Sequence, residues 1–391
     1  MSLRPVLGGG IAAMLALAAA AAPAEAAPTS FSFVEESVSP VTTVSPDVYF
    51  RASTGIYYLF TTGMSIGVYV SADGETWSKA ADAATPVGPY SDASVIDMPD
   101  GTFRMYLTER RAGSTAACAG KQLRYATSAD LVRWTLQPGI LLADLGCGVP
   151  DVVRDGDDYL LFYVRGGEGT DHGIYRATSQ DGLAWTAEAG IITPEDMVDP
   201  SVVKLADGGW LMMTADFPAG KAPGPFFQKL YVATSPDGRA WDFGDGSPVF
   251  APAGVGVFDP NLNLMPAGEL KVWFARGASA ETATVAHGVL SVQEPPVLQR
   301  PGKPAAAFTG MRAVTFSWDY PASGAVPDGF VVQSRKGSGW VSIADVPGSS
   351  RSWGTNRKAL GVTSGQRITV RVVAVLGAQR AASPQARFRV P

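Results

Sequence analysis

Asp199-Pro200-Ser201-Val202-Val203 is one of five copies of a motif in which a polar or proline-containing corner leads into a β-branched strand. The other copies begin at Ser45, Asp92, Val149 and Asp259. A second motif, a serine followed by an aspartate and a tryptophan, recurs at Ser71–Trp77, Ser128–Trp134, Ser179–Trp185 and Ser235–Trp241. A repeat of roughly 45 to 60 residues built from short strands is typical of radially repeated four-stranded sheets. Five copies predict an all-β chain with a five-bladed β-propeller.

The first 27 residues have the pattern of a secretory signal peptide. Arg4 precedes an almost wholly apolar run from Val6 to Ala22, and Ala24-Glu25-Ala26 follows it. A positive start, a short apolar segment and a small-x-small end are typical of a cleaved signal, whereas an uncleaved membrane anchor needs a longer apolar run. We therefore expect a secreted or periplasmic protein without a membrane attachment after cleavage.

The composition excludes some partners and favours a disulfide. The chain has 391 residues, 46% of them hydrophobic, which is enough for two well-buried domains. A formal net charge of -5 argues against nucleic-acid binding, which needs a basic surface. Cys118 and Cys147 are the two cysteines, and exported proteins more often bridge such a pair than leave it free. His172 and His287 are the two histidines, and no motif has metal-ligand spacing, so we expect no metal site and no cofactor.

The repeat pattern ends at Glu294-Pro295-Pro296, and a different pattern of strands follows. Alternating segments at 305–308, 314–318, 330–335, 340–343, 368–375 and 387–390 predict an immunoglobulin-like β-sandwich of seven strands. The strands around Trp318, Phe330 and Ile368 resemble a fibronectin type III domain, which implies a spacer or a module for cell-surface or matrix attachment. The predicted domains are a signal peptide (1–27), the propeller (28–294) and the sandwich (295–391).

The upper rim of the propeller is the predicted site. The first strand of each blade starts there beside the channel, and the second strand ends there. The rim should therefore carry Ser45, Asp47, Asp92, Asp151, Asp199, Asp259, Thr62, Glu109, Arg110, Arg165, Asp216 and Arg276. Several carboxylates around one channel repel one another unless a ligand or a reaction uses them. The alternative is that Asp-Pro corners only begin the strands.

Long connections also rise from this face, at 111–121, 166–172 and 217–228. They exceed what a hairpin needs, which suits a binding rim. Cys118 lies in the first of them and Cys147 just before the third inner strand, so both are expected at the same level. A disulfide between them would brace the rim.

The segments Asp199–Lys204, Tyr57–Phe60 and Tyr125–Trp134 resemble glycoside hydrolase families 43 and 32, the five-bladed furanosidases. The resemblance covers residues 40 to about 292. It implies hydrolysis by two carboxyl groups, one that protonates the leaving oxygen and one that activates water or attacks carbon. It also implies an Asp at the first corner, an Asp at the third and a Glu at the fourth. In this chain Ser45, Val149 and Val198 occupy those positions.

Asp199 keeps the Asp-Pro corner of the fourth blade and is predicted to be the general acid or the group that polarises the glycosidic oxygen. Its candidate partners are Asp92, Glu109 and Asp47, the last because strand alternation places it on the same side as the corner residue two positions earlier. The candidates for substrate binding are Arg110, Asp151, Arg165, Asp216, Asp259 and Arg276, with Tyr90 and Phe226 for a stacking face.

Three functions remain open from the sequence. The first is a secreted glycoside hydrolase that acts on a polysaccharide or oligosaccharide. The second is a non-catalytic carbohydrate-binding propeller, which the missing carboxylates favour. The third is a structural or adhesion protein whose rim carboxylates hold a cation such as calcium in the channel.

Overall fold

The computed structural model describes residues 30–391 except 64, 112, 114–117, 119, 168–169, 218–226, 294–297, 311, 323–324 and 378. The predicted signal peptide, Phe226 and the Pro295-Pro296 linker lie outside the described residues. The chain divides into two compact units, Thr29–Glu294 and Pro295–Pro391. The prediction of an all-β protein is confirmed, because helix in the described part is limited to α1 (Arg357–Leu360) and the 3-10 turn η1 (Ala280–Thr282). No helix in that part is long and apolar enough to cross a membrane.

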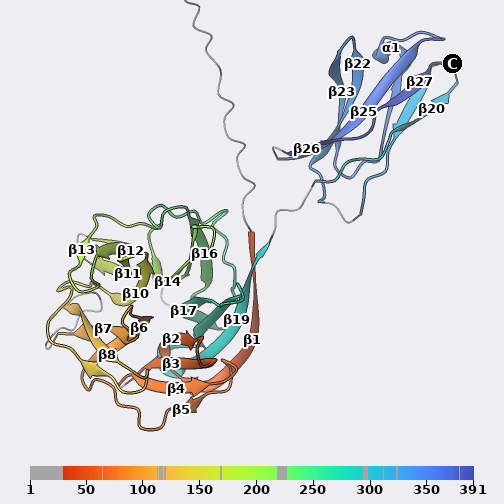
Figure 1. Ribbon diagram of the computed structural model, residues 1–391. Helices are drawn as coiled ribbons and strands as arrows, with labels where there is room; N and C mark the ends of the chain where they lie inside the picture. Colours follow the sequence, from red (N-terminus) through yellow and green to blue (C-terminus); the bar gives the residue numbers. More distant parts are fainter. Residues whose placement is uncertain are drawn as a thin grey trace, which may run out of the picture. The chain divides into compact units, whose positions relative to one another are not determined.

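Five antiparallel sheets make up the first unit (Figure 1). Sheet 1 contains β2 (Val44–Arg51), β3 (Ile56–Thr62), β4 (Gly67–Ser71) and β5 (Ser78–Lys79); sheet 2 contains β6 (Tyr90–Asp97), β7 (Phe103–Arg110), β8 (Lys121–Ser128) and β9 (Thr135–Leu136). Sheet 3 contains β10 (Gly148–Asp155), β11 (Asp158–Gly167), β12 (Thr170–Ser179) and β13 (Thr186–Ala187). Sheet 4 contains β14 (Met197–Lys204), β15 (Trp210–Asp216) and β16 (Leu230–Ser235). Sheet 5 contains β17 (Gly256–Leu264), β18 (Leu270–Gly277), β19 (Thr284–Gln293) and β1 (Ser30–Thr42).

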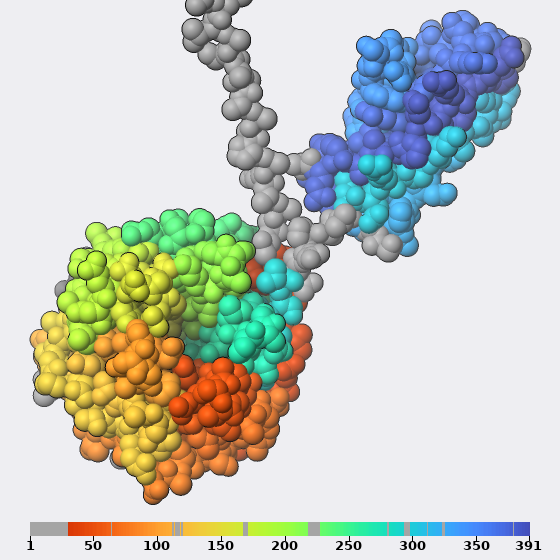
Figure 2. Space-filling model, in the orientation of Figure 1, coloured from red at the N-terminus to blue at the C-terminus, as the bar shows by residue number. Residues whose placement is uncertain are grey.

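The first strands of the five sheets form a closed ring. They contact one another in the order β2, β6, β10, β14, β17 and back to β2. In the space-filling view the colours follow one another round this unit from red through yellow and green to cyan (Figure 2). The ring of sheets therefore follows the order of the sequence repeats.

The N-terminal strand β1 completes the last sheet. It pairs antiparallel with β19, with Phe33 opposite Leu290, and so occupies the outer edge of sheet 5. The fifth repeat lacks the serine-aspartate-tryptophan motif, so its outer edge is free for this strand. Residues 30–42 therefore return to the fifth repeat and supply its outer strand.

The serine-aspartate-tryptophan motifs form tight turns. In the first of them the Asp73 carboxylate accepts the N–H groups of Glu75 and Thr76 at 2.8 and 2.7 Å. The Trp273 indole of sheet 5 donates to the Gly74 carbonyl of this turn at 2.7 Å, and the bond ties two neighbouring sheets together. These aspartates are structural, because their oxygens are used by the turn itself.

The second unit contains two sheets over one core. One sheet contains β20 (Ala305–Thr309), β21 (Ala313–Ser317) and β24 (Ser352–Asn356); the other contains β22 (Gly329–Lys336), β23 (Gly339–Pro347), β25 (Arg367–Leu376), β26 (Gln379–Ala382) and β27 (Ala386–Arg389). Phe316 from the first sheet and Phe330 and Val370 from the second are at most 1% exposed and share this core. Burial of one face of each sheet explains the alternating sequence pattern.

Candidate active site

Each inner strand begins with a β-bulge at the corner that the sequence motif marks. In sheet 1 the register passes from Val44 opposite Thr62 to Asp47 opposite Phe60, so that one extra residue lies on β2. The same irregularity occurs in the other four inner strands. The bulged residues have positive φ angles and are Ser45 (47°), Asp92 (53°), Val149 (51°), Asp199 (56°) and Asp259 (49°). Proline follows four of them, which suits a position that donates no ladder hydrogen bond.

The bulge directs the second residue after each corner at the neighbouring sheet. Its side chain accepts a backbone N–H from the next inner strand, and five such bonds run round the whole ring. They join Asp47 to Val95 (3.0 Å), Ser94 to Val152 (3.0 Å), Asp151 to Val202 (2.8 Å), Ser201 to Leu262 (2.8 Å) and Asn261 to Val48 (2.9 Å). Each bond satisfies a backbone donor beside the channel, so these residues link the sheets.

This ring corrects the predicted roles of Asp47 and Asp151. The strand-alternation argument that made Asp47 a catalytic candidate fails, because the bulge interrupts the alternation at the corner. The Asp47 carboxylate is instead held by the Val95 N–H and by the side-chain amide of Asn261, at 2.9 Å. Burial, and after it the charge of Asp151, raises the pKa of Asp47 well above its ordinary value. Burial raises the pKa of Asp151 to about 7.

A cavity of about 30 Å³ lies on the ring axis at this level. That volume has room for a water molecule or an ion and is far too small for a sugar. The carboxylates that line it are those of Asp47, Asp92, Asp151 and Asp259. Oxygen ligands of this kind suit calcium, so these are the residues that could hold the channel cation of the adhesion alternative.

Three predicted site residues and Ser45 form one hydrogen-bonded chain at the corners. The Ser45 N–H donates to Asp259 at 2.9 Å, and the Ser45 hydroxyl donates to Asp92 at 3.0 Å. The Ser91 hydroxyl donates to the other oxygen of Asp92 at 3.0 Å, and the Asp259 N–H donates to Asp199 at 3.4 Å. The corners therefore bring Asp92, Asp199 and Asp259 together, and the hydroxyl of Ser45 joins them where the resemblance implies a carboxylate.

The Asp199 and Asp259 side chains are in hydrogen-bond contact and titrate as a pair. Burial raises the pKa of Asp199 well above its ordinary value, and the charges of Asp259 and Asp92 raise it further. Burial, and after it the charge of Asp92, raises the pKa of Asp259 to about 6. Two buried carboxyl groups in contact retain a proton at a pH where an exposed aspartate has lost it. The pKa shift of Asp199 is therefore in the direction that a general acid requires.

The residue before this corner cannot supply the expected Glu side chain of the fourth repeat. Val198 is 5% exposed and packs in the apolar core of the ring. The carboxylate that sheet 4 places at the corner is Asp199 itself.

Glu109 and Tyr90 face each other on neighbouring strands of sheet 2. Burial raises the pKa of Glu109, but the hydrogen bonds of Gln122 and Arg124 outweigh it and lower the pKa overall. Its ion pair with Arg124 is 2.8 Å long. Glu109 is thus held as an anion, and the structure gives it no role as a proton donor. Tyr90 is only 7% exposed, so the prediction that it offers an open stacking face is wrong.

Most of the predicted substrate-binding groups are engaged by the protein. Arg165 pairs with Asp144 at 2.7 Å, and Arg276 pairs with Glu35 of β1 at 3.1 Å. Asp216 accepts the Lys229 N–H at 2.8 Å and the Tyr231 hydroxyl at 3.3 Å. Arg110 is exposed at the end of β7. Of this set, Arg110 is the best placed to meet a ligand.

The predicted disulfide between Cys118 and Cys147 is present. It closes a sequence separation of 29 residues and ties the connection after β7 to the start of β10. Sequence reasoning missed the contact between His172 and Asp196, whose ring nitrogen and carboxylate lie 2.9 Å apart at the starts of β12 and β14. Those two residues are 24 positions apart and belong to no motif, so the sequence carried no signal for them.

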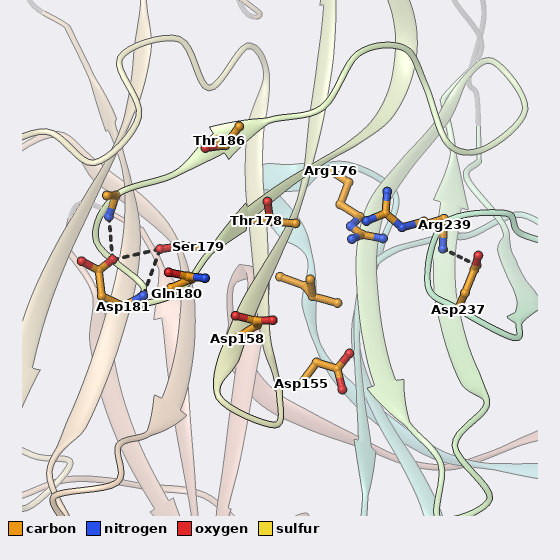
Figure 3. Close-up of a pocket in the computed structure, with 12 residues that line it drawn as sticks. Asp155, Asp158, Arg176, Thr178, Ser179, Gln180, Asp181, Thr186, Asp237 and Arg239 are labelled. Atoms are coloured by element: carbon orange, nitrogen blue, oxygen red, sulfur yellow. Dashed lines mark hydrogen bonds between the residues drawn. The ribbon is translucent and has the colours of Figure 1, made fainter.

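A larger hollow of about 800 Å³ lies away from the corner carboxylates, between sheet 3 and the Asp237 turn (Figure 3). Arg176 and Arg239 reach into it, and both pair with Glu188, at 3.2 and 3.3 Å. Asp181 is engaged by its own turn. None of the predicted catalytic residues lines this hollow, so the corner carboxylates remain the candidate site.

Several solved structures are similar to the chain. A thermostable family-43 glycoside hydrolase matches at 17% identity with a TM-score of 0.50, over 66% of this chain and 96% of that one. The alpha-L-arabinanase of Cellvibrio cellulosa with arabinohexaose matches at 14% identity and a TM-score of 0.49, over 63% of this chain and 91% of that one. An exo-1,5-alpha-L-arabinanase from a bovine ruminal metagenomic library matches at 13% identity with a TM-score of 0.49, over 65% of this chain and 97% of that one. No family model and no curated protein sequence matches the chain. The likeness concerns the fold.

Proposed function

We propose that the chain is a secreted glycoside hydrolase whose five sheets form a five-bladed β-propeller. It acts on a polysaccharide or oligosaccharide at the face where Asp92, Asp199 and Asp259 meet. The observation that carries this proposal is the buried carboxyl pair, because a carboxyl group that keeps its proton near neutral pH is what protonation of a leaving oxygen requires. The fold likeness to a family-43 glycoside hydrolase supports the same reading.

The proposed reaction divides two roles between Asp199 and Asp92. Asp199 donates its proton to the glycosidic oxygen as the bond between that oxygen and the anomeric carbon breaks. Asp92, whose two oxygens accept hydroxyl hydrogen bonds from Ser45 and Ser91, takes a proton from the water that adds to the anomeric carbon. After the products leave, Asp92 releases the proton that it took from water, and the Asp199–Asp259 pair takes up one proton from solvent. Each cycle thus consumes one water and restores both carboxyl groups.

A non-catalytic carbohydrate-binding propeller is the second candidate. Ser45 and Val149 at the first and third corners favour it, since the resembled families carry a carboxylate at both positions. Under this reading the corner network is a rigid floor for a glycan and Asp199 is a hydrogen-bond donor.

We propose further that residues 295–391 are a fibronectin type III-like sandwich that attaches the protein to a cell surface or matrix. Its support is the pair of sheets over one core and the strand pattern of the sequence. Residues 1–27 are proposed to be the signal peptide that exports the chain.

The test uses the exported chain without residues 1–27, incubated with a panel of furanoside and pyranoside polysaccharides. Release of new reducing ends from at least one of them is the expected result. Retention on a glycan in affinity electrophoresis without any release supports the binding candidate. If no glycan is cleaved and none retains the protein, both candidate functions are contradicted.

A further inference from the structure

Three residues from distant parts of the sequence meet where the ring closes. Glu36 comes from β1, His287 from β19, and Glu75 from the turn after β4 of sheet 1. One side-chain ligand atom of each lies within 4.8 Å of the other two. Both glutamates are exposed, so the group has an open side toward solvent.

His287 is buried, yet its ring has no hydrogen-bond partner among the residues that the structure describes. Its side chain is 2% exposed, and neither ring nitrogen makes a hydrogen bond to any described residue. The nearest carboxylate oxygen, on Glu36, lies 3.6 Å from Nδ1. A buried imidazole without partners is costly unless something absent from the protein itself satisfies it. One of the two unsatisfied ring nitrogens lies within 4.8 Å of a carboxylate oxygen of each glutamate.

The surrounding structure holds this arrangement in place. Glu36 is the extra residue in a register irregularity between Glu35 and Ser37, which turns it out of the β1–β19 ladder. The Trp273 ring packs on His287 with centroids 4.9 Å apart. The same Trp273 binds the carbonyl of Gly74, the residue before Glu75. One indole therefore fixes the imidazole and the turn that carries the second glutamate.

We propose that Glu36, Glu75 and His287 bind one zinc ion that fastens the closure of the ring. One imidazole nitrogen and two carboxylate oxygens are a ligand set for zinc, with water in the fourth position. Calcium takes oxygen ligands and has no use for the imidazole. Ligand atoms on tetrahedral zinc are about 3.3 Å apart, so small rotations of the exposed glutamate side chains close the set. The ion links the N-terminal strand, the last strand of sheet 5 and the turn of sheet 1.

The sequence argues against metal because positions 36, 75 and 287 form no local spacing. Only the return of β1 to sheet 5 and the contact of that sheet with sheet 1 bring them together.

The test titrates the chelator-treated, desalted protein with zinc chloride in a calorimeter. One zinc ion per chain is expected to bind the wild type. His287→Gln should lower the zinc affinity about 10-fold or more, because loss of a metal ligand lowers affinity at least as much as loss of a group that orients the ligand. His172→Gln removes the other histidine and should bind like the wild type. Calcium chloride in place of zinc should give no binding at this set.

Glu36→Gln and Glu75→Gln decide the matter if His287→Gln does not fold, because both side chains are exposed. Each should weaken zinc binding and abolish the rise in melting temperature that zinc produces in the wild type. Glu35→Gln, on the same strand as Glu36, should bind zinc as the wild type does and show the same rise in melting temperature. Absence of saturable binding, or binding that the Glu36, Glu75 and His287 variants leave unchanged, would overturn the proposal.

Discussion

Asp199 accepts the backbone N–H of Asp259 at 3.4 Å, and the two carboxyl groups are also in hydrogen-bond contact. Both residues occupy the bulged corner of their strand, with φ angles of 56° and 49°. Neighbouring sheets thus place two acids side by side beside the channel axis, where burial makes a full double charge costly. The pair consequently retains a proton into the pH range in which a glycosidase needs its acid.

Hydrolysis should decline as the pH rises. The general acid works only while the pair keeps its proton, and the pKa of Asp259 is raised to about 6. We expect kcat/KM on a responsive glycan to be highest on the acidic side and to fall through the titration of the pair, measured from pH 4 to 9. A profile that rises steadily with pH would contradict the assignment of Asp199 as the acid.

Asp151→Asn should stabilise the protein at neutral and alkaline pH. Burial raises the pKa of Asp151 in the folded state to about 7, so its contribution to stability is full below its ordinary pKa and is lost as the pH rises through 7. Asparagine keeps an oxygen for the Val202 N–H, as Asn261 does in sheet 5. A gain of about 1 to 2 kcal/mol at pH 8 is expected, well below the full value of the shift because the side chain is partly exposed.

Urea unfolding at pH 4.5 and pH 8 measures this difference. The wild type should lose more stability between the two pH values than Asp151→Asn does. Asp157→Asn, at an exposed turn, serves as the control and should follow the wild type. Parallel pH profiles for Asp151→Asn and the wild type would refute the linkage.

Ser94→Ala and Ser201→Ala should each destabilise the ring. Their hydroxyls accept the N–H groups of Val152 and Leu262, and both bonds are buried. Removal of the acceptor leaves a buried donor unsatisfied, which costs about 1 to 3 kcal/mol. Chemical denaturation gives the value, with Ser53→Ala at an exposed turn as the control. Losses no larger than that of the control would mean that these bonds do not hold the sheets together.

Val149→Asn should raise the melting temperature. Val149 has a φ of 51°, a left-handed conformation that is strained for a β-branched side chain and that asparagine tolerates. Relief of this backbone strain contributes about 1 to 2 kcal/mol, which exceeds the packing free energy that a half-buried valine side chain loses. The melting temperature should therefore rise by a few degrees. Val153→Asn on the same strand is the control and should lower the melting temperature. A fall in Val149→Asn as well would show that its packing outweighs the strain.

The sheets could be predicted from the sequence because each repeat carries local signals. Strand and turn signals can be recognised within a few positions of one another, as in the β-branched run Val202-Val203, the turn residues after it and the aromatic run at Trp210. The corner motif also located Asp92, Asp199 and Asp259, since equivalent positions in a closed ring converge. Recurrence and spacing were sufficient for these features.

The roles of Asp47, Asp151 and Tyr90 could not be predicted in the same way. A bulge is a property of the pairing between two strands, and the alternation rule applied to Asp47 has no means of detecting it. The acceptors of the inter-sheet bonds lie 48 or more positions from their donors, so nothing local marks them. The burial of Tyr90 depends on packing within its sheet and against sheet 1, which composition does not reveal.

The most direct test compares turnover in Asp199→Asn and Asp151→Asn on the same glycan at the optimum pH of the wild type. Both substitutions exchange a carboxylate beside the channel for an amide, but only Asp199 is assigned a proton to donate. We predict that Asp199→Asn remains folded, still binds the glycan and loses about 100-fold to 10,000-fold in turnover, whereas Asp151→Asn keeps the turnover of the wild type. Undiminished turnover in Asp199→Asn, or an equal loss in both variants, would contradict the account.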